Sequence, residues 1–194
     1  MQSSKKTLTE RARSEHLVQT SLEGISQKAK REKKYRFRDL YRQINKGALR
    51  LAWKKLNKKA AAGVDKITAK EFEGNLDENL NNILEMLKEK RYHAKLVRRK
   101  YIDKGNGKKR PLGIPALSDK IVQRAVADIL EAIYEEDFIE ESYGYRPNKS
   151  AKQAVIDLTK ELQFGKYNYI VEADIRGFFD NIDHDWLVKM LEDG

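Results

Sequence analysis

The sequence contains no cysteine, only three histidines and no long apolar run. The missing thiols exclude disulfide frameworks and thiolate metal sites, and His16, His93 and His184 are too scattered for a zinc cluster. Any metal is therefore expected to be a hard cation held by oxygen ligands. No stretch approaches the roughly 20 apolar residues of a membrane helix, and no signal-peptide core follows Met1–Lys6. These features predict a soluble, cytoplasmic protein without a membrane partner.

Positive charge is concentrated at the front of the chain. The net charge of +10 divides into +13 over residues 1–60, +5 over residues 61–110 and −8 over residues 111–194. The basic clusters interleave with aromatic residues, a mixture that suits phosphate neutralisation combined with base or sugar contacts. The alternative is an ordinary solvated helical face. Composition alone leaves both interpretations open.

Apolar spacing predicts helices over most of the first half. They are expected over about residues 1–35 and 38–57, with Gly63 supplying a left-handed turn beyond the second helix. The spacing Thr68 to Glu71 is that of a capping box and predicts a short helix, which a longer one follows.

From Leu96 onward the pattern changes: two predicted strands come first, and predicted helices follow them. Residues 97–103 and 110–114 flank a basic, glycine-containing stretch and predict a β-hairpin with a cationic tip. Ser118 is expected to cap a helix that runs to about Glu136. Two more helices are expected to bury one side each. Their buried residues would be Ala151, Ala154, Val155, Leu158 and Leu162 in the first, and Trp186, Leu187, Met190 and Leu191 in the second, which Asp183 caps.

Between those two helices, residues 169–175 alternate in side-chain direction and predict a strand. Asp174 would stand at its end, before the sequence Arg176-Gly177-Phe178-Phe179. Such an arrangement suits a hard divalent ion that meets a phosphate where the backbone turns beneath aromatic side chains. The alternative is that Asp174 caps a turn after an edge strand, and the local pattern leaves both open.

Four ordered blocks resemble the reverse transcriptases of bacterial group II introns, over roughly residues 37–194. The blocks are residues 52–65, before the generic polymerase motifs; 104–135, similar to the first fingers motif; 142–147, similar to the second; and 173–184, similar to the palm motif that bears the first metal-binding aspartate. The resemblance implies an α+β fold. It would consist of mostly helical reverse-transcriptase fingers with a basic β-hairpin, leading into the first strand and helix of a right-hand polymerase palm.

The same resemblance implies three parts. Residues 1–36 would be a basic helical N-terminal extension, residues 37–168 the fingers, and residues 169–194 the start of the palm. Polymerases of this family carry a Tyr-x-Asp-Asp tetrad on a second strand hairpin, and the sequence contains no such tetrad. The 194 residues are therefore expected to bind RNA without polymerising.

The activity implied is RNA-directed DNA polymerisation for a group II intron, with intron RNA binding and a maturase role in splicing. Two Mg²⁺ ions would support transfer of a deoxynucleoside triphosphate onto a primer 3′-hydroxyl. The expected partners are intron RNA, an RNA template, a DNA primer and the triphosphate, within a bacterial ribonucleoprotein. Formation of a homodimer is left open.

The resemblance also implies roles for single residues. Asp174 would hold metal and act in catalysis, and Lys104 and Arg110 would clamp the triphosphate. Phe179, with Phe178 as second choice, would reject a ribose 2′-hydroxyl. The residues expected to bind nucleic acid are Arg36, Arg38, Lys54, Lys55, Lys58, Lys59, Arg98, Arg99, Lys100 and Arg146.

Each assignment has a structural alternative. The hairpin tip could carry ordinary surface charge, the phenylalanines could pack in a core, and Arg146 could form a buried structural ion pair. Asp65 is expected to cap a turn. Asp180, Asp183 and Asp185 are expected at turns and helix starts rather than as metal ligands.

Two other functions compete with this one. A retron-type, diversity-generating or CRISPR-associated reverse transcriptase shares parts of these motifs, although residues 63–65 and 176–184 favour the intron-encoded class. From a different class, a non-catalytic splicing cofactor could use the basic N-terminal helices to bind intron RNA.

Overall fold

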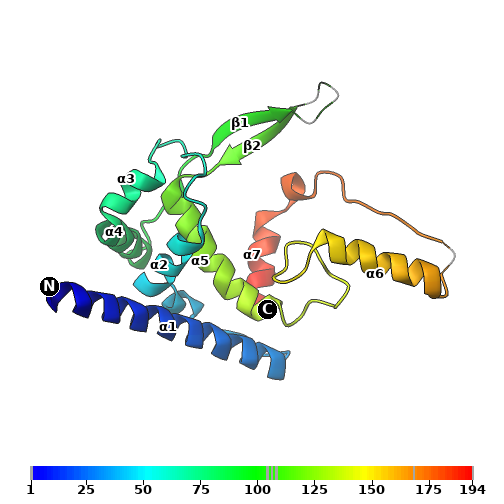
Figure 1. Cartoon of the computed structure of the whole chain (residues 1–194), viewed down its shortest axis with the longest axis horizontal. Helices are drawn as coiled ribbons and strands as arrows, with labels where there is room; N and C mark the ends of the chain where they lie inside the picture. Colours follow the sequence, from blue (N-terminus) through cyan, green and yellow to red (C-terminus); the bar gives the residue numbers. More distant parts are fainter. Residues whose placement is uncertain (1, 104, 106, 108, 168, 194) are drawn as a thin grey trace. The chain divides into compact units, whose positions relative to one another are not determined.

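The computed structural model describes residues 2–103, 105, 107, 109–167 and 169–193. Within these ranges helices dominate, and the sheet is a two-stranded antiparallel hairpin, so the chain is α+β (Figure 1). The chain divides into two compact units, Met1–Ile25 with Asp39–Ala132 and Ser26–Arg38 with Ile133–Gly194. The predicted functional boundaries at residues 36 and 168 remain predictions. In the described ranges no helix is both long and apolar enough to cross a membrane.

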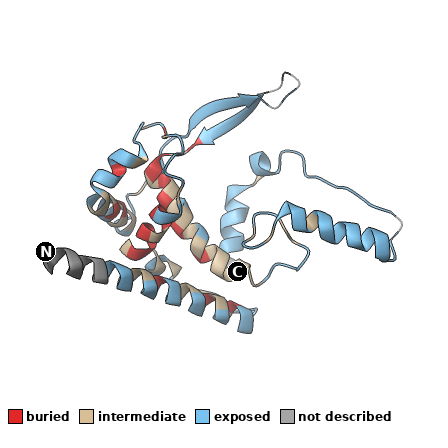
Figure 2. Cartoon of the chain, in the orientation of Figure 1, coloured by how far each residue is buried: buried red, intermediate tan, exposed pale blue. Residues whose placement is uncertain are grey.

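The first unit is built around a helical core. It contains α2 (Lys46–Lys55), α3 (Ala69–Gly74), α4 (Leu76–Lys88) and most of α5 (Leu117–Tyr134). The rings of Trp53 and Phe72 stack with centroids 5.3 Å apart. The buried core residues are Leu49, Ala52, Trp53, Phe72, Leu80, Ile83, Leu117, Ile121 and Ala125, and Figure 2 shows this burial concentrated in α2, α4 and α5. Removal of their apolar surface from water holds the unit together.

Helix α1 (Gln2–Arg31) confirms the first predicted helix, but the second one begins later than predicted. A short 3₁₀ helix, η1 (Leu40–Gln43), precedes α2. Asn45 then caps α2, because its side-chain oxygen accepts a hydrogen bond from the Ala48 amide at 3.0 Å. Asp39 has a left-handed backbone (φ 57°), which a continuous helix could not contain.

The predicted role of Gly63 is wrong. Its backbone is not left-handed; the glycines with positive φ in the described ranges are Gly105, Gly107 and Gly177. Gly63 instead lies against the chain just before α5, where a Cβ would come within 2.5 Å of the Ala116 Cα. Close backbone approach, rather than a turn, requires glycine here.

The capping box before α3 is confirmed. The Glu71 amide donates to the Thr68 hydroxyl oxygen at 3.3 Å, and the Thr68 amide donates to the Glu71 carboxylate at 2.8 Å. The cap predicted for α5 is wrong, because the helix begins at Leu117 and places Ser118 in its first turn. The Lys120 amide donates to the Ala116 carbonyl, so Ala116 and not Ser118 stands at the N-cap position.

The β-hairpin is confirmed. Strands β1 (Arg98–Asp103) and β2 (Lys109–Ile114) pair antiparallel, with Arg98 opposite Ile114 and Asp103 opposite Lys109. Every residue of the two strands is exposed except Ile114, at the base of β2. The hairpin therefore leaves both of its faces to solvent (Figure 2).

The second unit contains α6 (Ala151–Phe164), the 3₁₀ helix η2 (Phe178–Asn181) and α7 (His184–Asp193). The Asp183 cap is confirmed, since its carboxylate accepts from the amides of Asp185 and Trp186 at 3.0 Å. The predicted buried sides are wrong. Val155, Leu158 and Leu162 of α6 and Trp186, Leu187, Met190 and Leu191 of α7 are exposed. Periodicity predicts an apolar stripe but does not say whether anything covers it.

The strand predicted over residues 169–175 does not form. The described part of this stretch is irregular and exposed. A strand is stabilised by ladder hydrogen bonds to a neighbour, and the described residues form no sheet besides the β1–β2 hairpin. Asp174 therefore stands on an unpaired segment.

Candidate nucleic-acid interface

The hairpin arranges its cations by strand register. Opposite residues of an antiparallel ladder share a face, and so do residues two apart along a strand. Arg98, Lys100 and Arg110 therefore lie on one face, together with the apolar Ile102, Leu112 and Ile114. The other face carries Arg99, Tyr101, Asp103, Lys109, Pro111 and Gly113. Each face combines positive charge with apolar surface, as a nucleic-acid backbone with its sugars and bases requires.

The hairpin cations are not engaged within the chain. Across the described residues, the side chains of Arg98, Arg99, Lys100 and Arg110 have neither a hydrogen bond nor an ion pair, and all four residues are exposed. Their charge is thus available to an external anion. Lys104, expected beside Arg110 in triphosphate binding, lies outside the described residues.

The four lysines at the end of α2 and just after it differ from the hairpin cations because three of them have partners. Lys54 pairs with Glu15 at 2.6 Å and Lys55 with Asp128 at 2.9 Å. The Lys58 ammonium donates to the carbonyls of Trp53 and Leu56, and burial lowers its pKa. Lys59 is exposed, and its backbone amide donates to the Asn57 side chain.

Arg36 and Arg38 are exposed in the second unit, in the segment after α1. The neighbouring rings of Tyr35 and Phe37 meet edge to face at 5.0 Å. This segment therefore places two cations beside an aromatic pair.

Arg146 is buried, with 8% of its side chain exposed. Its guanidinium pairs with Glu135 at 2.8 Å and donates to the carbonyls of Ile139 and Ser142 at 2.7 and 2.9 Å. These contacts hold the segment 139–146 against Glu135, just after the end of α5, inside the second unit. The geometry supports the structural alternative for Arg146, and a contact with template or nucleotide stays a prediction.

Asp174 is exposed, and the chain turns shortly after it. Gly177 is left-handed (φ 63°) and precedes η2, where Phe178 and Phe179 meet edge to face at 5.2 Å. Neither ring is in a core, since Phe179 is 78% exposed. The packing alternative for the two phenylalanines therefore has no support in the described residues.

The described residues do not form a metal site. They contain no group of three or more His, Cys, Asp or Glu side chains placed to hold an ion. One exposed carboxylate does not fix Mg²⁺, which takes octahedral oxygen coordination. The role of Asp174 as a metal ligand stays a prediction, and the described residues do not complete a centre around it.

Asp65 caps a turn, as predicted. Its carboxylate accepts from the Ile67 amide at 3.2 Å and pairs with the Lys95 ammonium at 3.0 Å. Asp119, only 2% exposed, accepts from the Tyr92 hydroxyl at 2.6 Å and the Lys95 amide at 3.1 Å. Burial and the bond to Asp119 raise the pKa of Tyr92. Sequence reasoning missed this group, because partners 24 and 27 positions apart leave no local signal.

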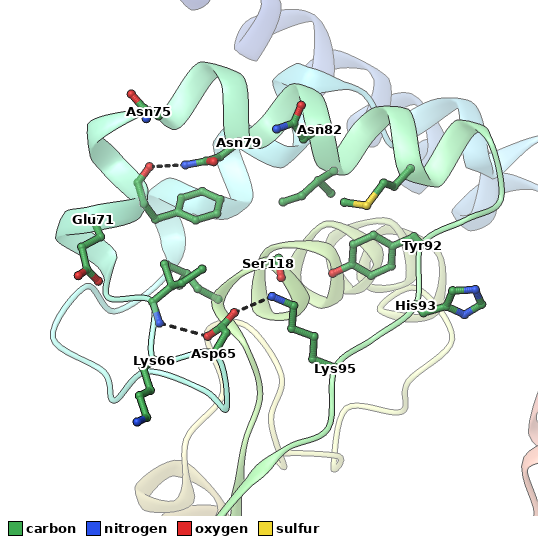
Figure 3. Close-up of a pocket in the computed structure, with 15 residues that line it drawn as sticks. Asp65, Lys66, Glu71, Asn75, Asn79, Asn82, Tyr92, His93, Lys95 and Ser118 are labelled. Atoms are coloured by element: carbon green, nitrogen blue, oxygen red, sulfur yellow. Dashed lines mark hydrogen bonds and ion pairs between the residues drawn. The ribbon is translucent and has the colours of Figure 1, made fainter.

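A pocket of about 650 Å³ in the first unit is lined by Asp65, Ile67, Tyr92 and Lys95 of this group. Figure 3 shows α3 and α4 on one side and the turn at Asp65, the segment with Tyr92 and Lys95, and the start of α5 on the other.

Comparison with known proteins identifies relatives. Residues 102–193 match the family model described as reverse transcriptase (RNA-dependent DNA polymerase). The chain is 38% identical over 172 residues to the group II intron-encoded protein LtrA of Lactococcus lactis subsp. cremoris, covering 88% of this chain and 28% of that protein. It is 39% identical over 134 residues to protein YkfC of Escherichia coli (strain K12), covering 66% and 35%. It is 32% identical over 156 residues to a 91 kDa protein in the cob intron of Schizosaccharomyces pombe, covering 79% and 19%.

The chain thus spans between about a fifth and a third of the length of these relatives. The family match begins inside β1 and includes β2, α5, α6 and α7. Motifs, family model and relatives agree, and over most of its length the chain is similar to the group II intron-encoded reverse transcriptases.

Proposed function

We propose that this chain supplies the fingers and the start of the palm to an RNA-directed DNA polymerase of a group II intron, one that also binds its intron RNA and supports splicing. The observation that carries the proposal is the exposed hairpin with its unengaged cations, three of which lie just before the residues that match the reverse transcriptase family and one, Arg110, among them. Phosphate neutralisation by such residues supplies most of the affinity of a nucleic-acid interface.

Within the hairpin, Arg110 is the proposed triphosphate ligand. Its guanidinium can bind phosphate oxygens through two parallel hydrogen bonds. Arg98 and Lys100 share its face and would follow a template or primer backbone. Arg99 on the other face would contact a second stretch of backbone.

Asp174 is the proposed Mg²⁺ ligand, with the remaining ligands supplied from outside the described residues. Bound Mg²⁺ would stabilise the charge that develops on the oxygens of the transferred phosphoryl group. The exposed rings of Phe178 and Phe179 would lie against the sugar of the incoming nucleotide and exclude a 2′-hydroxyl.

Substitution of Asp174 tests this role. In the natural polypeptide that carries this sequence, Asp174→Asn is expected to abolish primer extension on an RNA template and to leave RNA affinity unchanged. Asp180→Asn, three residues after the glycine turn, is the matched control and should retain extension. Full extension by the Asp174→Asn protein would remove Asp174 from the metal site.

A non-catalytic splicing cofactor is the second candidate, and the +13 charge of residues 1–60 favours it. The same variants separate the two functions. A polymerase loses extension with Asp174→Asn, whereas a cofactor shows no extension in either form and retains RNA-dependent splicing. The names of the relatives favour the intron-encoded class over retron-type, diversity-generating or CRISPR-associated enzymes.

A further inference from the structure

The pocket beside Asp119 has an apolar floor. Phe72, Ile83 and Leu117 line it and belong to the buried core. Met86 and the ring of Tyr92 add further apolar surface. A volume of about 650 Å³ lies in the range of sites that accept one small organic molecule. The floor favours a flat or apolar group over a hydrated ion.

Side-chain amides from one helix provide the polar groups of the pocket. Asn75, at the start of α4, and Asn79 and Asn82 within it all line the space (Figure 3). Asn79 donates to the Phe72 carbonyl at 2.9 Å and keeps its own oxygen as an acceptor. The side chains of Asn75 and Asn82 have no partner among the described residues. An amide offers both donors and an acceptor, which matches the edge of a nucleobase.

The carboxylates of the pocket already have partners within the chain. Asp65 is paired with Lys95, and Glu71 is engaged in the capping box with Thr68. The interior therefore suits an uncharged ring. Figure 3 shows Lys66 and His93 at separate places on the rim, both directed away from the pocket. At the rim, the Lys66 ammonium can neutralise one phosphate beside an inserted base, and the His93 ring can donate a hydrogen bond to another.

We propose that this pocket receives one unpaired base of an RNA strand. The base would lie on the apolar floor, its edge would bond the α4 amides, and its flanking phosphates would contact Lys66 and His93. The proposal rests on the proposed RNA binding and adds a site away from the hairpin. Unstacked bases of single-stranded RNA are commonly held in this way by protein side chains.

The fluorescence of Trp53 can report ligand binding in the pocket. Its ring stacks on Phe72, which lines the pocket, so a ligand on the floor should change Trp53 fluorescence. The sequence contains only two tryptophans. Trp186→Phe removes the other, which is exposed on α7. In this background, titration with AMP, GMP, CMP or UMP is expected to give a saturable change, whereas ribose 5-phosphate gives none.

Two α4 variants provide a matched pair. Asn82→Leu removes a lining amide and is expected to weaken mononucleotide binding by about two- to tenfold, the worth of one hydrogen bond. Asn81→Leu, next to it but outside the lining, should bind like the parent.

The outcomes separate this proposal from the proposed function. If the chain binds RNA but no mononucleotide changes Trp53 emission up to millimolar concentration, the pocket proposal is wrong and RNA binding stands. An equal response to ribose 5-phosphate, or equal affinities of the two asparagine variants, also overturns it. A response to N-acetyl-leucinamide alone would assign the pocket to a protein side chain instead. If the chain binds no RNA at all, the proposed function itself fails.

Discussion

The Lys58 ammonium lies 3.7 Å from the centroid of the Trp53 ring. It also donates to the Trp53 carbonyl, one of the last carbonyls of α2. Lys58 thus closes a helix end and covers a core tryptophan. The next residue, Lys59, has the same side chain but makes none of these contacts. Two adjacent lysines that look equivalent in sequence therefore have different roles.

Lys58→Met is expected to lower the free energy of unfolding by about 1 kcal/mol, because the cation–π contact and the carbonyl bonds are lost. RNA affinity should change little. Lys59→Met is the matched control and should leave stability unchanged. Chemical denaturation and RNA titration of both variants check this, and a stable Lys58→Met protein with impaired RNA binding would reverse the two roles.

Asp77 is surrounded by three cations. Its carboxylate bonds Arg11 at 2.5 Å and Lys46 at 3.0 Å, and it pairs with Arg50, whose side chain is only 10% exposed. Burial acts to raise the pKa of Asp77, but the bond from Lys46 and the charges of Arg50 and Arg11 outweigh it, so the pKa lies below its ordinary value.

This lowered pKa gives a defined pH dependence. Asp77→Asn is expected to cost about 1–3 kcal/mol at pH 7, because Arg50 stays buried without its charged partner. The advantage of the parent should be complete above the ordinary aspartate pKa of about 4. It should fade as the pH falls through the lower folded pKa, where Asp77 becomes protonated. Urea unfolding of both proteins between pH 2 and pH 7 measures the difference, and a pH-independent difference would refute the ion-pair explanation.

Gly63→Ala is expected to destabilise the first unit by about 1–3 kcal/mol, because the new Cβ would overlap the backbone at Ala116. Gly74→Ala is the control, since nothing lies within 4 Å of a Cβ there. Gly74 also ends α3, where alanine favours a helix by up to about 1 kcal/mol. Thermal unfolding of both variants measures the two effects. Equal melting temperatures would contradict the close approach of Gly63 to the Ala116 backbone.

Local sequence signals were sufficient for several elements. The Thr68–Glu71 capping box, the Asp183 cap and the hairpin each depend on residues a few positions apart, and all three formed as predicted. Helix existence was likewise readable from apolar spacing. The start of α2 was not, because the Asn45 side chain accepts from the Ala48 amide and caps the helix there instead of letting it extend toward residue 38.

Features that depend on distant partners could not be predicted. Periodicity marked the apolar sides of α6 and α7 but could not show that they are exposed. The unpaired stretch 169–175 reads as a strand because alternation does not reveal whether a pairing partner is present. The Asp119 group and the pocket depend on contacts between α3, α4 and α5 that no short window contains.

The residues of the candidate interface differ in whether their charge is available to a ligand. The cations on β1 and β2 are unpaired among the described residues, and their nucleic-acid role stays a prediction. Lys58, expected from its basic cluster, and Arg146, expected from the second motif, are occupied by internal contacts. Charge type is visible in a sequence, but its availability depends on the fold.

The central claim is that the hairpin cations bind nucleic acid, and the salt dependence of RNA affinity tests it most directly. The variant Arg98→Gln/Arg99→Gln/Lys100→Gln removes the three cations of β1 that are proposed to contact nucleic-acid backbone. The charge-matched control Lys152→Gln/Lys160→Gln/Lys166→Gln removes exposed lysines of the second unit. For single-stranded RNA, each lost phosphate contact should reduce the slope of log affinity against log salt by about 0.7. The hairpin variant should therefore lose about 2 from the slope and the control close to none; equal slopes in all three proteins would contradict the account.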